Sequence, residues 1–174
     1  MDFKIGQKVS YPNHGVCAIE GIDRKQVGGT EVELYSLRVA SNNSVILVPK
    51  ANAHAIGIRP IISDSQCSKL LDTLSEDFLE ISNDWKIRVR DYNAKIQTGN
   101  VFEATDVLKH LTFLSYSKQL SFREQRLLEK AKFLVVSELA ASCCKSEVDI
   151  ECEVSGLLET TCRKHLAEMP DAAQ

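Results

Sequence analysis

The chain has 174 residues, with 21 lysines and arginines, 24 aspartates and glutamates, and a formal net charge of −3. Its hydrophobic content of 44% and charged content of 26% are typical of globular proteins. No apolar run approaches the roughly 18 residues that a transmembrane helix needs. Residues 1–6 lack the apolar core of a signal peptide. We therefore expect a cytoplasmic protein of one large or two small domains, without membrane contact.

Charge is unevenly distributed along the chain. Residues 143–174 hold three Lys/Arg and seven Asp/Glu, whereas residues 1–62 hold seven Lys/Arg and five Asp/Glu. A basic surface on this protein must therefore be a local patch and not the field of the whole molecule.

Residues 1–60 have the alternating pattern of short β-strands. Tyr35, Leu37 and Val39 share one face of a strand, and in an earlier strand we expect Val16, Ala18 and Ile22 to share one side. Turn sequences separate the strands, at Pro12–Gly15, Gly28-Gly29 and Asn42-Asn43. Four or five short strands predict a small, strongly bent sheet, a β-barrel of the SH3-like or Tudor-like kind. Such barrels more often bind partners through an edge strand or groove than through a deep pocket.

After a linker near residues 57–64, the apolar period changes from 2 to 3.6, which predicts an all-α helical bundle and an α+β fold class overall. The expected helices cover residues 65–77, 84–98, and two segments between residues 100 and 142. Two helix starts carry a capping-box pattern, Asn100 with Glu103 and Ser121 with Glu124.

Residues 143–174 form an acidic extension. Its residues 146–167 have a weaker helical pattern, which Ser155-Gly156 should interrupt. The last residues, from Met169 onward, are expected to fray.

The helix predicted over residues 84–98 holds the only tryptophan, Trp85. Three cations follow at Lys86, Arg88 and Arg90, and Arg126 and Lys130 lie one turn apart in a later helix. A large aromatic beside such cations suits nucleic acid, because cations neutralise phosphate and an apolar wedge presses on a base step. The alternative is that Trp85 caps the core, since Val89, Tyr92 and Ile96 continue its stripe.

No catalytic constellation is visible. Gly28-Gly29 lacks the Lys-Ser/Thr of a phosphate-binding loop, and no G-x-S-x-G elbow occurs. The six cysteines form no C-x-x-C pair, so free thiols are expected, and the zinc candidates reduce to Cys152, Cys162 and His165. We expect no enzyme, no metal and no cofactor. A small enzyme that uses Cys17 or His14 is the weakest alternative.

Several separated motifs resemble one family. Residues 3–16 resemble the F-K-x-G-D-x-V-x-Y-P-x-x-G-V opening of bacterial CarD/CdnL transcription regulators. That opening is similar to the RNA polymerase-interacting domain of the transcription-repair coupling factor. Residues 85–90 resemble the family's W-x-x-R helix, residues 98–103 its T-G-x-V-x-E junction and residues 120–128 its L-S-x-x-E-x-x-M-L turn. The match runs in register over residues 3–142 and does not cover the acidic tail.

The resemblance implies that residues 1–60 form a Tudor-like domain that docks on the lobe of the RNA polymerase β subunit. Leu37, Leu47 and Pro49 would lie in or near that contact, with Lys25 close by.

Residues 64–142 would contact promoter DNA without reading its base sequence. Trp85 would enter the minor groove at the upstream edge of the melted bubble, and Arg88, with Lys86 and Arg90 nearby, would hold phosphates. Arg126 and Lys130 are further candidates for DNA contact. Together these contacts would stabilise the open promoter complex.

The resemblance thus leads us to expect a monomer that is associated with the nucleoid through RNA polymerase. The main alternative is a polymerase-binding adaptor whose helical domain binds another protein and not DNA.

Overall fold

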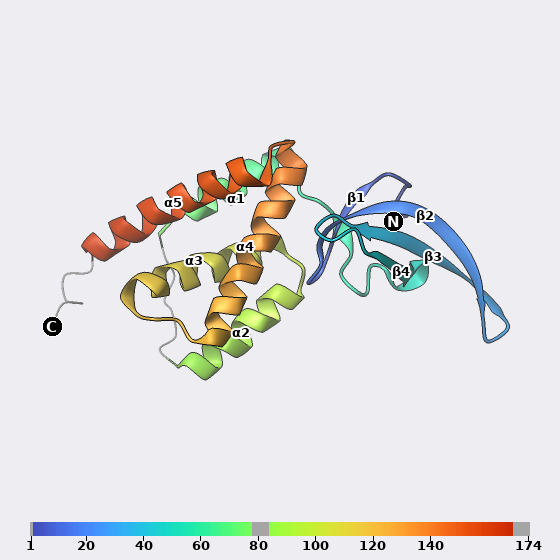
Figure 1. The fold of residues 1–174 in the computed structure, drawn as a ribbon, viewed down its shortest axis with the longest axis horizontal. Helices are drawn as coiled ribbons and strands as arrows, with labels where there is room; N and C mark the ends of the chain where they lie inside the picture. Colours follow the sequence, from blue (N-terminus) through green and yellow to red (C-terminus); the bar gives the residue numbers. More distant parts are fainter. Residues whose placement is uncertain (1, 78–83, 169–174) are drawn as a thin grey trace. The chain divides into compact units, whose positions relative to one another are not determined.

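The computed structural model describes residues 2–77 and 84–168 (Figure 1). The chain divides into two compact units, Met1–Ile61 and Ile62–Gln174. The first holds an antiparallel sheet and the second holds helices, which confirms the predicted α+β class. Among the helices described, none has the length and apolar character to cross a membrane.

Five strands form the sheet: β1 (Lys8–Tyr11), β2 (Gly15–Val27), β3 (Thr30–Val39), β4 (Val45–Pro49) and β5 (Arg59–Pro60). Their order is β4-β3-β2-β1-β5, and neighbouring strands are antiparallel. A short 3-10 helix, η1 (Lys50–Asn52), follows β4. Strands β4 and β5 are the two edges of this order, so the described sheet is not closed into the predicted barrel.

The buried face of β3 is as predicted, because Tyr35, Leu37 and Val39 all lie in the core of the sheet unit. The β2–β3 turn is also confirmed: Gly28 and Gly29 have φ values of 59° and 83°, which suit glycine in a two-residue hairpin loop.

The predicted grouping on β2 is wrong for Ile22. Val16 and Ala18 alternate with the core residues Cys17 and Ile19, so they lie together on the opposite side of the strand. A register shift between Ile19 and Gly21 adds an extra residue, so Ile22 pairs with the core residue Tyr35 and lies on the side of Cys17 and Ile19.

The second unit contains α1 (Asp64–Ser75), α2 (Trp85–Gln97), α3 (Val101–Ser117), α4 (Phe122–Cys143) and α5 (Glu147–Glu168). Ser121 and Glu124 form the predicted capping box at the start of α4.

The capping box predicted for α3 is wrong. Asn100 Oδ1 accepts a hydrogen bond from the Phe102 N–H at 3.0 Å, as an N-cap should. A capping box also needs the Glu103 carboxylate to accept from the Asn100 N–H, but the hydroxyl of Thr98 does so instead. This hydroxyl also donates to the Glu103 carboxylate.

Helix α5 is part of the helical core and lies alongside α1 (Figure 1). Ile150, Val154 and Leu158 belong to the same buried cluster as residues of α1, α3 and α4. The helix runs through Gly156 without the predicted interruption, because burial of this face outweighs the roughly 1 kcal/mol that a helical glycine costs. The helical unit therefore continues past residue 142, and the segment expected to fray, from Met169, lies outside the described residues.

The ammonium group of a buried lysine in α3 caps the C-terminal end of α1. The Lys109 ammonium donates to the carbonyl oxygens of Thr73 at 2.5 Å, Glu76 at 3.0 Å and Asp77 at 3.5 Å. These carbonyls lie at the negative end of the α1 dipole, where a cation is stabilising. Burial lowers the pKa of Lys109.

Candidate functional site

Trp85 is the first residue of α2, and its side chain is 47% exposed. The N-cap carboxylate of Asp84 accepts a hydrogen bond from the Lys86 N–H at 2.8 Å. The Lys86 ammonium lies 5.8 Å from the centroid of the Trp85 ring. The indole borders a hollow that is also lined by Leu120 and Glu124. A large aromatic surface is thus presented to solvent next to a cation.

The rest of the Trp85 stripe turns into the core. Tyr92 and Ile96 are buried members of the helical core, and Val89 packs against it. Trp85 is the exposed end of this stripe and is not among the residues of that cluster.

Arg88 does not project with its neighbours. Its side chain is 3% exposed, and its Nη2 lies 2.9 Å from Glu124 Oε1, whose side chain is 4% exposed. Arg90, in contrast, is exposed and pairs with its neighbour in the sequence, with Nε 3.2 Å from the Asp91 carboxylate. The buried position of Arg88 does not fit the phosphate-holding role that the resemblance implies. Lys86 and Arg90 remain available for it.

Glu124 joins α2 to the start of α4. Its Oε2 accepts hydrogen bonds from the Ser121 N–H at 3.0 Å and the Ser121 hydroxyl at 2.7 Å, while Oε1 receives Arg88. Burial acts to raise the pKa of Glu124, but the hydrogen bonds from Arg88 and Ser121 outweigh it and hold the pKa at about 2. The carboxylate is therefore charged at neutral pH.

A second exposed aromatic lies at the start of α4. Phe122 is 72% exposed, and the guanidinium carbon of Arg126 lies 5.5 Å from its ring centroid. Phe122 is not among the candidate residues that the sequence indicates. The available signal was an aromatic directly after the N-cap Ser121 and off the apolar stripe of Leu127 and Ala131.

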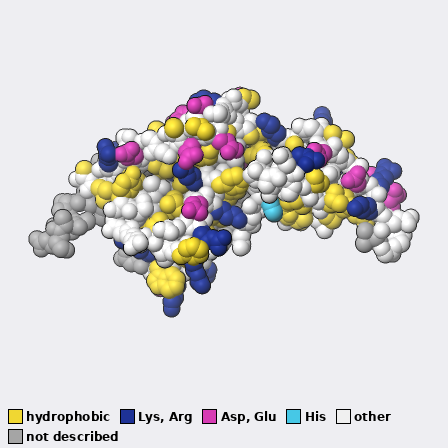
Figure 2. Space-filling model, in the orientation of Figure 1, with side chains coloured by type: hydrophobic (Ala, Val, Ile, Leu, Met, Phe, Trp, Pro, Cys, Tyr) yellow, Lys and Arg dark blue, Asp and Glu magenta, His cyan; other side chains and the backbone are white. Residues whose placement is uncertain are grey.

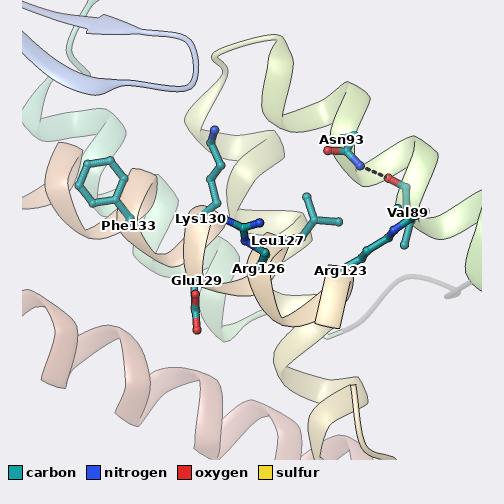
Figure 3. A pocket seen from close by; sticks show the side chains of 8 residues that line it. All are labelled: Val89, Asn93, Arg123, Arg126, Leu127, Glu129, Lys130 and Phe133. Carbon is teal, nitrogen blue, oxygen red and sulfur yellow. Dashed lines mark hydrogen bonds between the residues drawn. The ribbon is translucent and has the colours of Figure 1, made fainter. Parts of the chain in front are cut away.

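A groove of about 770 Å³ lies between α2 and α4 (Figure 3). It is lined by Val89 and Asn93 of α2 and by Arg123, Arg126, Leu127, Glu129, Lys130 and Phe133 of α4. Two of the predicted DNA-binding cations, Arg126 and Lys130, thus meet in one groove with Arg123. Lys130 is half-buried, and burial lowers its pKa. Hydrophobic side chains lie among Lys and Arg side chains at the lower edge of this unit in Figure 2.

The candidate polymerase-binding residues lie on three strands of the sheet unit. Leu47 is 40% exposed on the edge strand β4, which Pro49 ends. Lys25 is exposed on β2, two strands away from that edge. Leu37 is completely buried, so its side chain supports β3 from inside and is not available to a partner.

Comparison with known proteins gives matches to both units. The family model described as CarD-like/TRCF RID domain matches residues 3–62, and that described as CarD, C-terminal domain matches residues 69–155. The Bacillus subtilis (strain 168) protein named "Putative transcription factor YdeB" is 26% identical over 137 residues, which cover 79% of this chain and 90% of that protein. The solution NMR structure of the 72-residue N-terminal domain of Myxococcus xanthus CarD is 36% identical. That match covers 34% of this chain and 79% of the other, with a TM-score of 0.30.

Proposed function

Because the chain belongs to the CarD family of RNA polymerase-associated transcription regulators, we propose that it stabilises the open promoter complex. In this proposal the sheet unit binds the lobe of the polymerase β subunit, and the helical unit holds promoter DNA at the upstream edge of the bubble. One observation carries the DNA part: Trp85 is exposed at a helix start, beside Lys86 and close to a hollow at the start of α4.

Trp85 acts as the wedge in this proposal. Its indole presses into the minor groove where the duplex opens, and the exposed ring of Phe122 provides a second apolar surface. Lys86, Arg90 and Arg126 neutralise nearby phosphates. Neither phosphate contacts nor an apolar wedge reads base edges, so binding is independent of sequence.

Open-complex stabilisation follows from differential binding. Contacts that exist only with opened DNA shift the equilibrium toward the open state by their own free energy. About 1.4 kcal/mol of such contacts changes the ratio of open to closed complexes tenfold. Weak DNA affinity is therefore compatible with a large effect.

The edge strand β4 carries the polymerase contact in this proposal. An edge strand presents backbone N–H and C=O groups to a partner strand, and exposed side chains such as Val45 and Leu47 add apolar contact. Pro49 ends β4 and so limits how far a partner strand can pair. Lys25 lies on β2, two strands away from this edge, and would make a separate peripheral contact.

The DNA part is tested with Trp85→Ala in the full chain. The lifetime of open complexes should fall to nearly that seen without the protein, while polymerase binding and the urea midpoint stay unchanged. Tyr116→Ala is the matched control, because Tyr116 is an aromatic of similar exposure that lines neither the hollow beside Trp85 nor the groove between α2 and α4. An unchanged lifetime with Trp85→Ala would contradict the DNA role and favour the adaptor alternative.

The polymerase part is tested with Leu47→Glu. A charged side chain on β4 should reduce retention by the immobilised β-subunit lobe at least tenfold. Ile5→Glu places the same charge on an exposed apolar residue of the same unit outside β4 and should leave retention unchanged. Equal losses in both variants would remove β4 from the contact.

A further inference from the structure

We propose that Arg88 is a positioning residue: its ion pair with Glu124 fixes the start of α2 on α4 and thereby sets where Trp85 meets DNA. The inference rests on the proposed wedge role of Trp85. In this role Arg88 contacts Glu124, which lies 36 residues later in the chain, in place of the phosphate contact that the resemblance implies.

Both partners of the ion pair are buried, and the carboxylate has a second partner in Ser121. Arg88 and Glu124 are both nearly inaccessible to solvent, and Ser121 occupies the second oxygen of the carboxylate. An arginine held this way offers little charge to a DNA phosphate. It instead links α2 to the start of α4, because the same carboxylate completes the capping box of α4.

The pair lies close to Trp85 along α2. Arg88 follows Trp85 by three residues, so both lie on the same side of α2, one turn apart. Trp85 and Glu124 also line the same hollow. At the N-terminus of α2, the side chain of the N-cap Asp84 accepts one hydrogen bond from the helix backbone. A change at the ion pair therefore moves the first turn of α2 and the ring that it carries.

Positioning and phosphate contact make opposite predictions for Glu124→Gln. This variant removes a negative charge, leaves every cation in place and retains a residue that can serve the capping box. If Arg88 binds phosphate, freeing it from its partner strengthens DNA binding or leaves it unchanged. If Arg88 positions Trp85, binding weakens.

The experiment measures binding of the full chain to a DNA duplex with a mismatched bubble over a series of salt concentrations. We expect Arg88→Gln and Glu124→Gln each to weaken binding at least threefold without changing the salt slope. Arg90→Gln is the matched control, an exposed arginine two residues away. Its loss should lower the salt slope by about one, as for a phosphate contact.

Two further readouts separate positioning from a general structural role. In a Trp85→Ala background, Arg88→Gln should cause no additional loss of bubble binding, because its effect acts through the ring. The chain has one tryptophan, so acrylamide quenching reports on this ring alone. Arg88→Gln and Glu124→Gln should both change the quenching constant, whereas Arg90→Gln should not.

An additive loss in the Trp85→Ala background, together with a lower salt slope, would overturn the positioning role and restore the phosphate contact. If Trp85→Ala alone leaves bubble binding unchanged, the proposed function fails and takes this inference with it. Should Arg88→Gln fail to fold, the double variant Arg88→Gln/Glu124→Gln replaces it, because that variant leaves no unpaired buried charge.

Discussion

Helices α2 and α4 begin in the same way but are held differently. Each starts with an exposed aromatic, Trp85 or Phe122, directly after an N-cap residue. At α4 the N-cap Ser121 and Glu124 form a reciprocal capping box. At α2 the N-cap Asp84 accepts one hydrogen bond, from the Lys86 N–H. The two helix starts thus differ in what stabilises them. The start of α4 is stabilised by its own capping box, and the start of α2 by the ion pair with Glu124 of α4.

Glu124→Ala should have the largest effect on this arrangement. It removes the capping box and leaves the Arg88 charge buried without its partner, at a cost of about 3–5 kcal/mol in the free energy of unfolding. Asp84→Ala is the comparison, since loss of an exposed N-cap costs about 1 kcal/mol. Urea unfolding of both variants measures the difference. Equal costs would mean that the two helix starts are supported alike.

Acid should weaken the same junction. The pKa of Glu124 is about 2 in the folded protein, below its ordinary 4.5, so folding favours the charged carboxylate. The stabilisation is complete above about pH 4.5 and is lost as the pH falls toward 2. The urea midpoint should therefore decrease across this window. In Glu124→Gln the decrease should be smaller, and an identical pH profile would show that other carboxylates account for it.

Phe122→Ala should have the smallest effect on stability, within about 0.5 kcal/mol, because the ring is largely exposed. If Phe122 extends the wedge surface, bubble binding should fall about threefold while the Trp85 quenching constant stays the same. A changed quenching constant would mean that the two helix starts are coupled through their rings as well as through Glu124.

Local signals in the sequence predicted the features that depend on neighbouring residues. The turn at Gly28-Gly29 and the capping box of Ser121 and Glu124 are both as expected. The exposed Trp85 also agrees with a stripe that leaves the core at its N-terminal end.

Features that depend on distant contacts could not be predicted in this way. The burial of Arg88 requires knowing that Glu124 lies opposite it, and periodicity within one helix contains no such information. The bulge after Ile19 moved Ile22 away from the side of Val16 and Ala18 for a similar reason. Gly156 suggested a break that packing of α5 against α1 overrides.

Lys109 of α3, which binds the carbonyl end of α1, can report on opening of the helical unit. Lys109 is enclosed by carbonyl oxygens, and its lowered pKa reflects burial. Amine-directed reagents should therefore modify the exposed lysines first and reach Lys109 only when α1 separates from α3. Its rate of labelling, followed by mass spectrometry, would measure how often the helical unit opens under conditions in which the protein is still folded.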